Sequence, residues 1–197
     1  MDLNSVSNRA ILTTIFPGLA NDPQFKICSP QTPVYNCIAW AMGFKNRWVS
    51  NTSSIIVNFY HNRYVWWPEG VEDSQRCEAL IEAFRALGFE PTENHNYNPL
   101  YDKAILYTDG KIWTHASRII EEGIEHSKFG EEWDAIHGND RFQGSSYGYP
   151  YVIMQRLHSL KKEYLSKHPL KIADHQINEE KAAVFMQILK AVMLSSK

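Results

Sequence analysis

The sequence predicts an α+β domain in which helices come first and antiparallel strands follow. Apolar side chains recur at helical spacing over residues 73–88. Between residues 104 and 129, short apolar runs alternate with turn signals, which is typical of a β-meander. The chain has 197 residues, of which 44% are hydrophobic and 13% aromatic, so it is long enough to bury a substantial core.

The first predicted buried helix starts near residue 36. Residues 1–35 contain four prolines and are expected to form a loop-rich lead-in with one early helix. Residues 36–44 then form a compact apolar run with Gly43 near its end. Asn36 is a favourable N-cap residue, so the helix is expected to begin there.

The second predicted helix spans residues 73–88. Asp73 or Ser74 is expected to cap its start, and Gly88 stands at its end. Cys77 lies on the apolar face, so we expect it to be a core thiol.

The strands are predicted from turn signals and alternation. Asp109-Gly110 is a strong hairpin signal between a strand at 104–107 and a return strand at 112–120. A second turn at Glu122-Gly123 leads to a third strand at 124–129. A loop over 130–149 and a further strand at 151–154 complete the expected sheet.

The chain is expected to divide into a domain over 1–156 and a helical extension over 157–197 that packs on it. Helical spacing returns at 157–165 and at 179–194.

Charge and composition exclude several classes of function. The formal net charge of −2 shows no excess of positive charge that would favour binding to nucleic acid or anionic lipid, and we expect neither as a partner. No apolar run approaches the roughly 18 residues of a membrane span. The start lacks a signal-peptide pattern, so we expect a cytoplasmic protein or one exported by a leaderless route. We expect no metal and no cofactor, because the phosphate-loop and metal-ligand motifs are absent.

Cys37 is the first candidate catalytic residue. The chain has three cysteines, and such a small, odd number argues against a disulfide framework. A thiol at a helix start lies beside free N–H groups that lower its pKa, so we expect Cys37 to be partly ionised. The alternative is that Cys37 is a small buried core residue.

His115 is the second candidate, because a strand would hold its imidazole rigidly on one face of the sheet. From there it could take the thiol proton and return it to a leaving group. The chain has eight histidines. His115 is distinguished by the order of a nucleophile helix followed by a base strand.

An ordered series of segments accompanies this pair. It comprises 35–43 around Cys37, 66–68, 83–90, 103–107, 114–118 around His115, 127–130, 134–137 and finally 147–148. Over residues 25–156 this series resembles a group of small bacterial proteins that are themselves similar to papain-like cysteine peptidases of the cell-wall endopeptidase branch. The resemblance implies a papain-like fold, with a nucleophile helix packed on a small antiparallel sheet.

The resemblance further implies that Cys37 is the nucleophile and His115 the general base. A third residue would orient the imidazole, and in that branch it lies on the strand after the histidine strand. Ser127 holds this position, Asp134 is the carboxylate alternative and His137 is a third candidate. Only the carboxylate would stabilise an imidazolium by charge.

Substrate contacts are expected from two groups of residues. Gln31, Tyr35 and Asn36 compete for the oxyanion hole, since papain-like enzymes often have a Gln shortly before the cysteine. The chain has six Trp and ten Tyr, which favours either a large aromatic core or an aromatic-walled groove. Trp66 and Trp67 could form one wall of such a groove.

Two functions therefore stay open. The first is a thiol hydrolase or acyl transferase that acts on an amide-type bond in a peptide, a protein or a peptidoglycan peptide, either in the cytosol or as a bacterial effector. The second is a catalytically inactive binding module that uses the aromatic groove. The sequence does not specify the oligomeric state.

Overall fold

The computed structural model describes residues 2–51 and 65–169, and the expected helix at 179–194 lies outside these residues. The helices are α1 (Val6–Ile15), η1 (Pro17–Leu19), α2 (Cys37–Met42), α4 (Cys77–Arg85), η2 (His158–Leu160) and α5 (Lys161–Ser166). The strands are β1 (Lys26–Ile27), β2 (Trp48–Val49), β3 (Val65–Trp66), β4 (Glu90–Thr92), β5 (Tyr101–Thr108), β6 (Trp113–Glu121), β7 (Ile124–Lys128), β8 (Asp134–Gly138) and β9 (Tyr149–Leu157).

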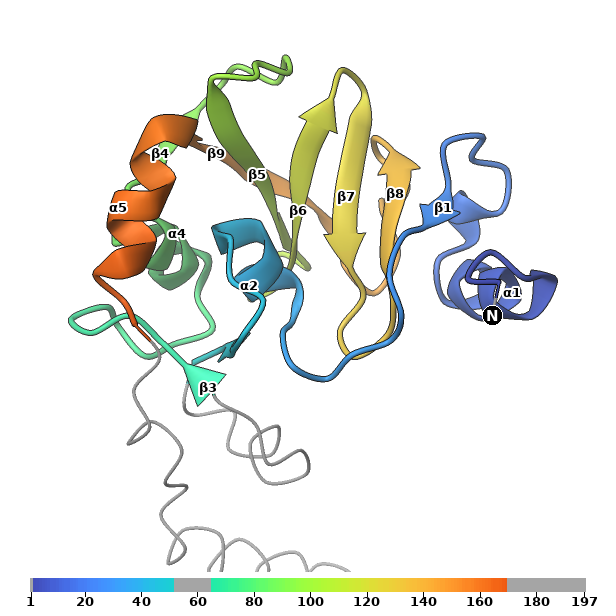
Figure 1. Cartoon of the computed structure of the whole chain (residues 1–197), viewed down its shortest axis with the longest axis horizontal. Helices are drawn as coiled ribbons and strands as arrows, with labels where there is room; N and C mark the ends of the chain where they lie inside the picture. The colour runs from blue at the N-terminus through green and yellow to red at the C-terminus, as the bar shows by residue number, and fades with distance from the viewer. Residues whose placement is uncertain (1, 52–64, 170–197) are drawn as a thin grey trace, which may run out of the picture.

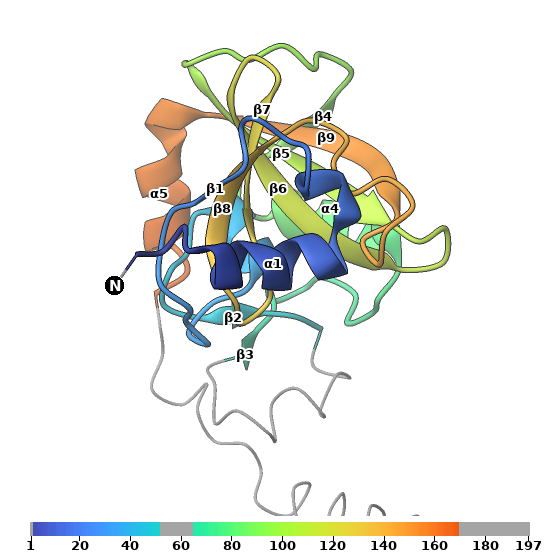
Figure 2. The ribbon, with the colours of Figure 1, turned by 90° about the vertical axis from the view of Figure 1, so that its right-hand side faces the viewer.

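The main sheet has seven strands in the order β1-β8-β7-β6-β5-β9-β4, and every neighbouring pair is antiparallel. Strands β2 and β3 form a separate parallel pair. Figure 1 shows α2, α4 and α5 on one side of the main sheet and α1 on the other. Figure 2 looks onto the α1 side, where α1 crosses in front of the strands. The α+β class predicted from the sequence is confirmed.

Strand alternation divides the core into two clusters. On β5, Ala104 and Leu106 pack with α2 and α4, whereas Ile105 and Tyr107 pack with α1. Successive side chains of a strand point to opposite faces, so each strand supplies both clusters. The same alternation decides which candidate residues share a face.

The ends of α2 follow from its sequence. The Asn36 side chain accepts a hydrogen bond from the Ala39 N–H at 3.0 Å, as the N-cap prediction requires. Gly43 ends the helix with a φ of 106°, in the left-handed region that favours glycine.

Several predicted elements differ in detail. The cap of α4 is Arg76 without a side-chain bond, rather than Asp73 or Ser74. Cys77 is half-buried, because it stands at the very start of the helix. Part of the loop expected over 130–149 is strand β8, which pairs with β7 along its whole length. Its alternation was hidden by flanking glycines and acidic residues.

Residues 157–165 were expected to be helical, but Leu157 ends β9 and the α-helix starts only at Lys161. Leu165 of α5 packs against the α2–α4 cluster. Among the described residues, no helix is both long and apolar enough to cross a bilayer.

Candidate active site

Cys37 is the first residue of α2 and only 8% of its surface is exposed. Its sulfur lies against the backbone of Ala116 on β6, next to His115 in the sequence. Helix α2 packs on β6 more extensively than on the other strands of the sheet. The sequence therefore folds so that the thiol meets the histidine strand itself, at Ala116.

The thiol is neutral at physiological pH, contrary to the expectation of partial ionisation. Burial raises the pKa of Cys37 to about 11, although the backbone groups of Ala116, Ile38 and Cys37 and the charge of Lys128 act to lower it. The stabilisation of the thiolate at the helix start is thus present. It is outweighed by the loss of water around the sulfur.

His115 is completely buried, among aromatic rings on the α1 side of the sheet. The Tyr147 ring stacks flat on the imidazole, with ring centroids 3.8 Å apart and planes 5° apart. Tyr107, Phe129 and Phe142 also contact it. Burial and the neighbouring His137 hold the pKa of His115 well below its ordinary value, so the imidazole is neutral.

A hydrogen-bonded chain fixes the orientation of this imidazole. His115 Nε2 lies 3.1 Å from Ser127 Oγ on β7, and Ser127 Oγ lies 2.8 Å from His137 Nε2 on β8. His137 Nδ1 lies 2.9 Å from the Gly138 carbonyl oxygen. Two of the three candidates for the orienting residue therefore act together, Ser127 directly and His137 through it.

This hydrogen-bonded series also determines which ring nitrogens of His137 and His115 carry a proton. A carbonyl oxygen only accepts, so His137 carries its proton on Nδ1, and its Nε2 accepts from the Ser127 hydroxyl. Ser127 has no second proton, so His115 Nε2 donates to it. His115 Nδ1 is then unprotonated and carries a lone pair, and this buried atom has no hydrogen-bond partner.

Cys37 and His115 are not hydrogen-bonded to each other. The thiol belongs to the core cluster on the α2 side, and the imidazole lies among rings of the cluster on the α1 side. Tyr147 interacts with both residues. It stacks on His115, and its hydroxyl pKa is raised first by burial and then by the charge of Cys37. Successive residues of β6 point to opposite faces, so the thiol over Ala116 and the imidazole of His115 lie on opposite sides of the sheet.

Asp134, the carboxylate candidate, is not joined to His115. Its Oδ2 accepts from the Tyr35 hydroxyl at 2.8 Å, and its Oδ1 is buried without a hydrogen-bond partner. It faces the α2 side, because Ala135 and His137 take the other face of β8. The sequence could not show this, since it depends on the register of β8.

The predicted oxyanion residues have other partners. Gln31 is exposed and donates to the carboxylate of Glu132. Asn36 uses both ends of its amide, accepting from the Ala39 and Val49 N–H groups and donating to the Val49 carbonyl. Tyr35 is bound to Asp134. Each of these contacts is structural.

The two tryptophans, the candidates for a groove wall, pack against the core cluster around α2 and α4. Trp67 stacks with Trp113 at 6.2 Å, and Trp66 meets Phe44 edge-on at 5.4 Å. Arg47 lies over the Trp66 ring at 5.2 Å.

Comparison with protein families gives one match. A family described as a domain of unknown function, DUF7689, covers residues 26–155. The chain belongs to this family. Cys37, His115, Ser127, His137 and Tyr147 all lie inside the DUF7689 domain, and α1 precedes it. No curated protein and no solved structure matches the chain.

Sequence reasoning gave no role to Tyr147 of the DUF7689 domain, and it missed a second buried network on the α1 side. Glu125 on β7 accepts from Tyr107 at 2.7 Å and from Ser117. Residues 125 and 127 share a strand face, as do 115 and 117. That parity was readable from the sequence once β6 and β7 were paired.

Proposed function

We propose that this domain is a thiol hydrolase or acyl transferase with a papain-like arrangement, in which Cys37 is the nucleophile and His115 the general base. Its substrate is an amide-type bond in a peptide, a protein or a peptidoglycan peptide. The supporting observation is the chain from His115 through Ser127 and His137 to the Gly138 carbonyl. In this hydrogen-bonded series the protonated nitrogen of His115, Nε2, donates to Ser127 and fixes the orientation of the ring. The unprotonated Nδ1 is then available as a base.

The chemistry begins from a neutral pair. As Cys37 Sγ attacks the carbonyl carbon, its proton passes to His115 Nδ1. The imidazolium then gives this proton to the leaving nitrogen while the C–N bond breaks, which leaves a thioester on Cys37. His115 next deprotonates a water that cleaves the thioester, or an amine that accepts the acyl group.

The backbone N–H of Cys37 and that of Ala116 beside the sulfur are candidates for the oxyanion hole. The raised pKa of Cys37 means that deprotonation accompanies attack rather than preceding it. Because the thiol and the imidazole face opposite sides of β6 in the structure, this proton transfer requires a rearrangement of β6 or α2 that brings the two groups within hydrogen-bond reach.

The burial of Cys37 favours the second candidate, a binding module without catalysis. A thiol that is 8% exposed and has no bond to a base is also what a core cysteine looks like. The two functions differ in whether any covalent change in a substrate depends on Cys37.

The deciding experiment compares the wild type with Cys37→Ser and Cys37→Ala on peptidoglycan fragments and on a proteome, with mass changes as the readout. Cys28→Ala is the matched control, since the Cys28 thiol donates to the Lys26 carbonyl and takes no part in the proposed chemistry. Peptide cleavage, or a gain of about one dalton at glutamine, should appear with the wild type and the control and vanish in both Cys37 variants. Changes that persist in Cys37→Ser would exclude Cys37 as the nucleophile and refute the proposal.

A further inference from the structure

One edge of the main sheet is only partly covered. Strand β9 pairs with β5 along its length, but on its other side β4 reaches only Ile153, Met154 and Gln155. Within the described residues, no strand pairs with 149–152 on that side. Tyr149 and Tyr151 are 57% and 48% exposed. The edge therefore offers unpaired peptide groups to an extended chain.

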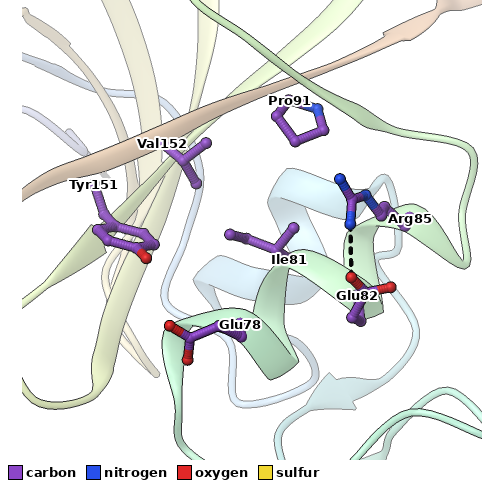
Figure 3. A pocket seen from close by; sticks show the side chains of 7 residues that line it. All are labelled: Glu78, Ile81, Glu82, Arg85, Pro91, Tyr151 and Val152. Atoms are coloured by element: carbon purple, nitrogen blue, oxygen red, sulfur yellow. Dashed lines mark hydrogen bonds and ion pairs between the residues drawn. The ribbon is translucent and has the colours of Figure 1, made fainter.

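Two pockets meet at this open edge, one on each face of the sheet. The first, of about 420 Å³, lies between α4 and β9 (Figure 3). The second, of about 610 Å³, lies on the opposite face over β5 and β9. Tyr151 and Val152 line both pockets. Alternate side chains of a strand placed along 149–152 would enter the two pockets in turn, because successive residues point to opposite faces.

The larger pocket is acidic. Glu93 and Asp140 supply its charge, Glu125 and His95 also line it, and no lysine or arginine is among the described residues around it. Glu125 is 1% exposed and is held in place by Tyr107 and Ser117, which donate to its Oε2. Neither Glu93 nor Asp140 forms an ion pair with a described residue. This pocket suits a lysine or arginine side chain.

The smaller pocket has an apolar centre. Figure 3 shows Ile81 of α4 facing Val152 and Tyr151, with Pro91 on the far side. Its acidic residues at the rim are already compensated, since Glu82 pairs with Arg85 at 2.7 Å and Glu78 with Arg76 at 3.4 Å. This pocket suits an apolar side chain.

We propose that the open edge of β9 is a docking site for an extended peptide segment with adjacent basic and apolar residues. The peptide adds as a strand beside 149–152, its basic side chain enters the acidic pocket, and its apolar side chain packs on Ile81. Charge complementarity selects this occupant. Two copies of this chain meeting edge to edge would bring their acidic pockets against each other.

The test uses the full chain and a fluorescein-labelled, capped octapeptide of alternating arginine and valine, with binding followed by fluorescence anisotropy. One comparison peptide replaces arginine with glutamate, and a second carries backbone N-methyl groups that remove its N–H donors. Glu93→Gln/Asp140→Asn should weaken binding at least about tenfold. Ile81→Lys, a separate variant in the apolar pocket, should also weaken binding of the arginine peptide. Glu69→Gln/Glu72→Gln removes the same charge elsewhere and should bind as the wild type does.

Hydrogen exchange provides the positional readout, since bound peptide should protect amides within 149–152. The proposal is overturned if the glutamate or N-methylated peptide binds as tightly as the arginine peptide. It is likewise overturned if the double pocket variant binds like the wild type, or if protection appears elsewhere. A dimer that buries this edge and excludes the peptide would show that a second copy is the occupant instead.

Discussion

His115 Nε2 and Ser127 Oγ lie 3.1 Å apart on neighbouring strands, and the same hydroxyl continues to His137. Ser127 is fully buried, so each of its hydrogen bonds replaces water that the site excludes. This serine is therefore the residue on which the orientation of the candidate base depends.

Ser127→Ala should destabilise the fold because it leaves His115 Nε2 and His137 Nε2 without partners. Each unsatisfied buried group costs about 1–3 kcal/mol, so for two groups we expect a loss of about 2–6 kcal/mol in the free energy of unfolding. Urea denaturation followed by tryptophan fluorescence measures it. Ser146→Ala, on an exposed loop position, is the control and should show no measurable change. Equal stabilities of the two variants would contradict the chain of hydrogen bonds.

Alkylation of Cys37 should be slow at neutral pH. With a pKa raised to about 11 by burial, the thiolate fraction at pH 7 is about 10⁻⁴, and the rate should rise about tenfold per pH unit. Iodoacetamide should modify the half-buried Cys28 and Cys77 first. Peptide mass spectrometry between pH 6 and 9 gives the three rates separately. A fast rate at Cys37 that is flat across this range would instead indicate a preformed thiolate–imidazolium pair.

Arg156→Met should be among the most damaging substitutions. Arg156 is 1% exposed, and its guanidinium pairs with Asp102 at 2.8 Å. It also donates to the Leu87 carbonyl at 3.0 Å and the Met42 carbonyl at 3.3 Å, which joins the ends of α4 and α2 to β9. Breaking a buried pair costs about 3–5 kcal/mol. Thermal unfolding measures the loss.

The control for this substitution is Arg85→Met, which removes an ion pair on the surface. Its melting temperature should equal that of the wild type. A wild-type melting temperature for Arg156→Met would mean that the guanidinium contributes nothing net.

Glu125 should make stability fall as the pH rises from about 4.5 to about 7. Burial raises its pKa from 4.5 to about 7, outweighing the hydrogen bonds from Ser117 and Tyr107 that lower it. Over this interval the folded carboxyl keeps its proton while the unfolded one loses it, so unfolding releases a proton and becomes more favourable with pH. Above pH 7 the free energy of unfolding is lower by a few kcal/mol than it is below pH 4.5, as far as Glu125 contributes.

Glu125→Gln cannot ionise, so its stability should lack this fall. Urea denaturation at several pH values between 5 and 8, on both proteins, tests the difference. The buried histidines act in the opposite sense. His137 has its pKa lowered by burial to about 4, so its contribution is lost as the pH falls below about 6.5 in both proteins. Parallel pH profiles for the wild type and the variant would contradict the assignment to Glu125.

The local elements that the sequence predicted are those governed by neighbouring residues. Asn36 caps α2 and Gly43 ends it, and Gly110 and Gly123 turn the strands with positive φ. These features depend on short-range hydrogen bonds and backbone freedom, which a few adjacent residues decide. The candidate thiol and histidine belong to such elements, and so they could be named in advance.

Tertiary structure alone decided which of these residues act together. Ser127 and His137 bond in series because β7 and β8 pair in one register, and a shift of one residue would turn both to the other face. The same register directs Asp134 to Tyr35 and away from His115. The neutral state of Cys37 also comes from the packing of the whole domain, because burial depends on atoms far away in the sequence. Local sequence thus determined the identity of the candidate pair, and the fold determined its partners and its charge.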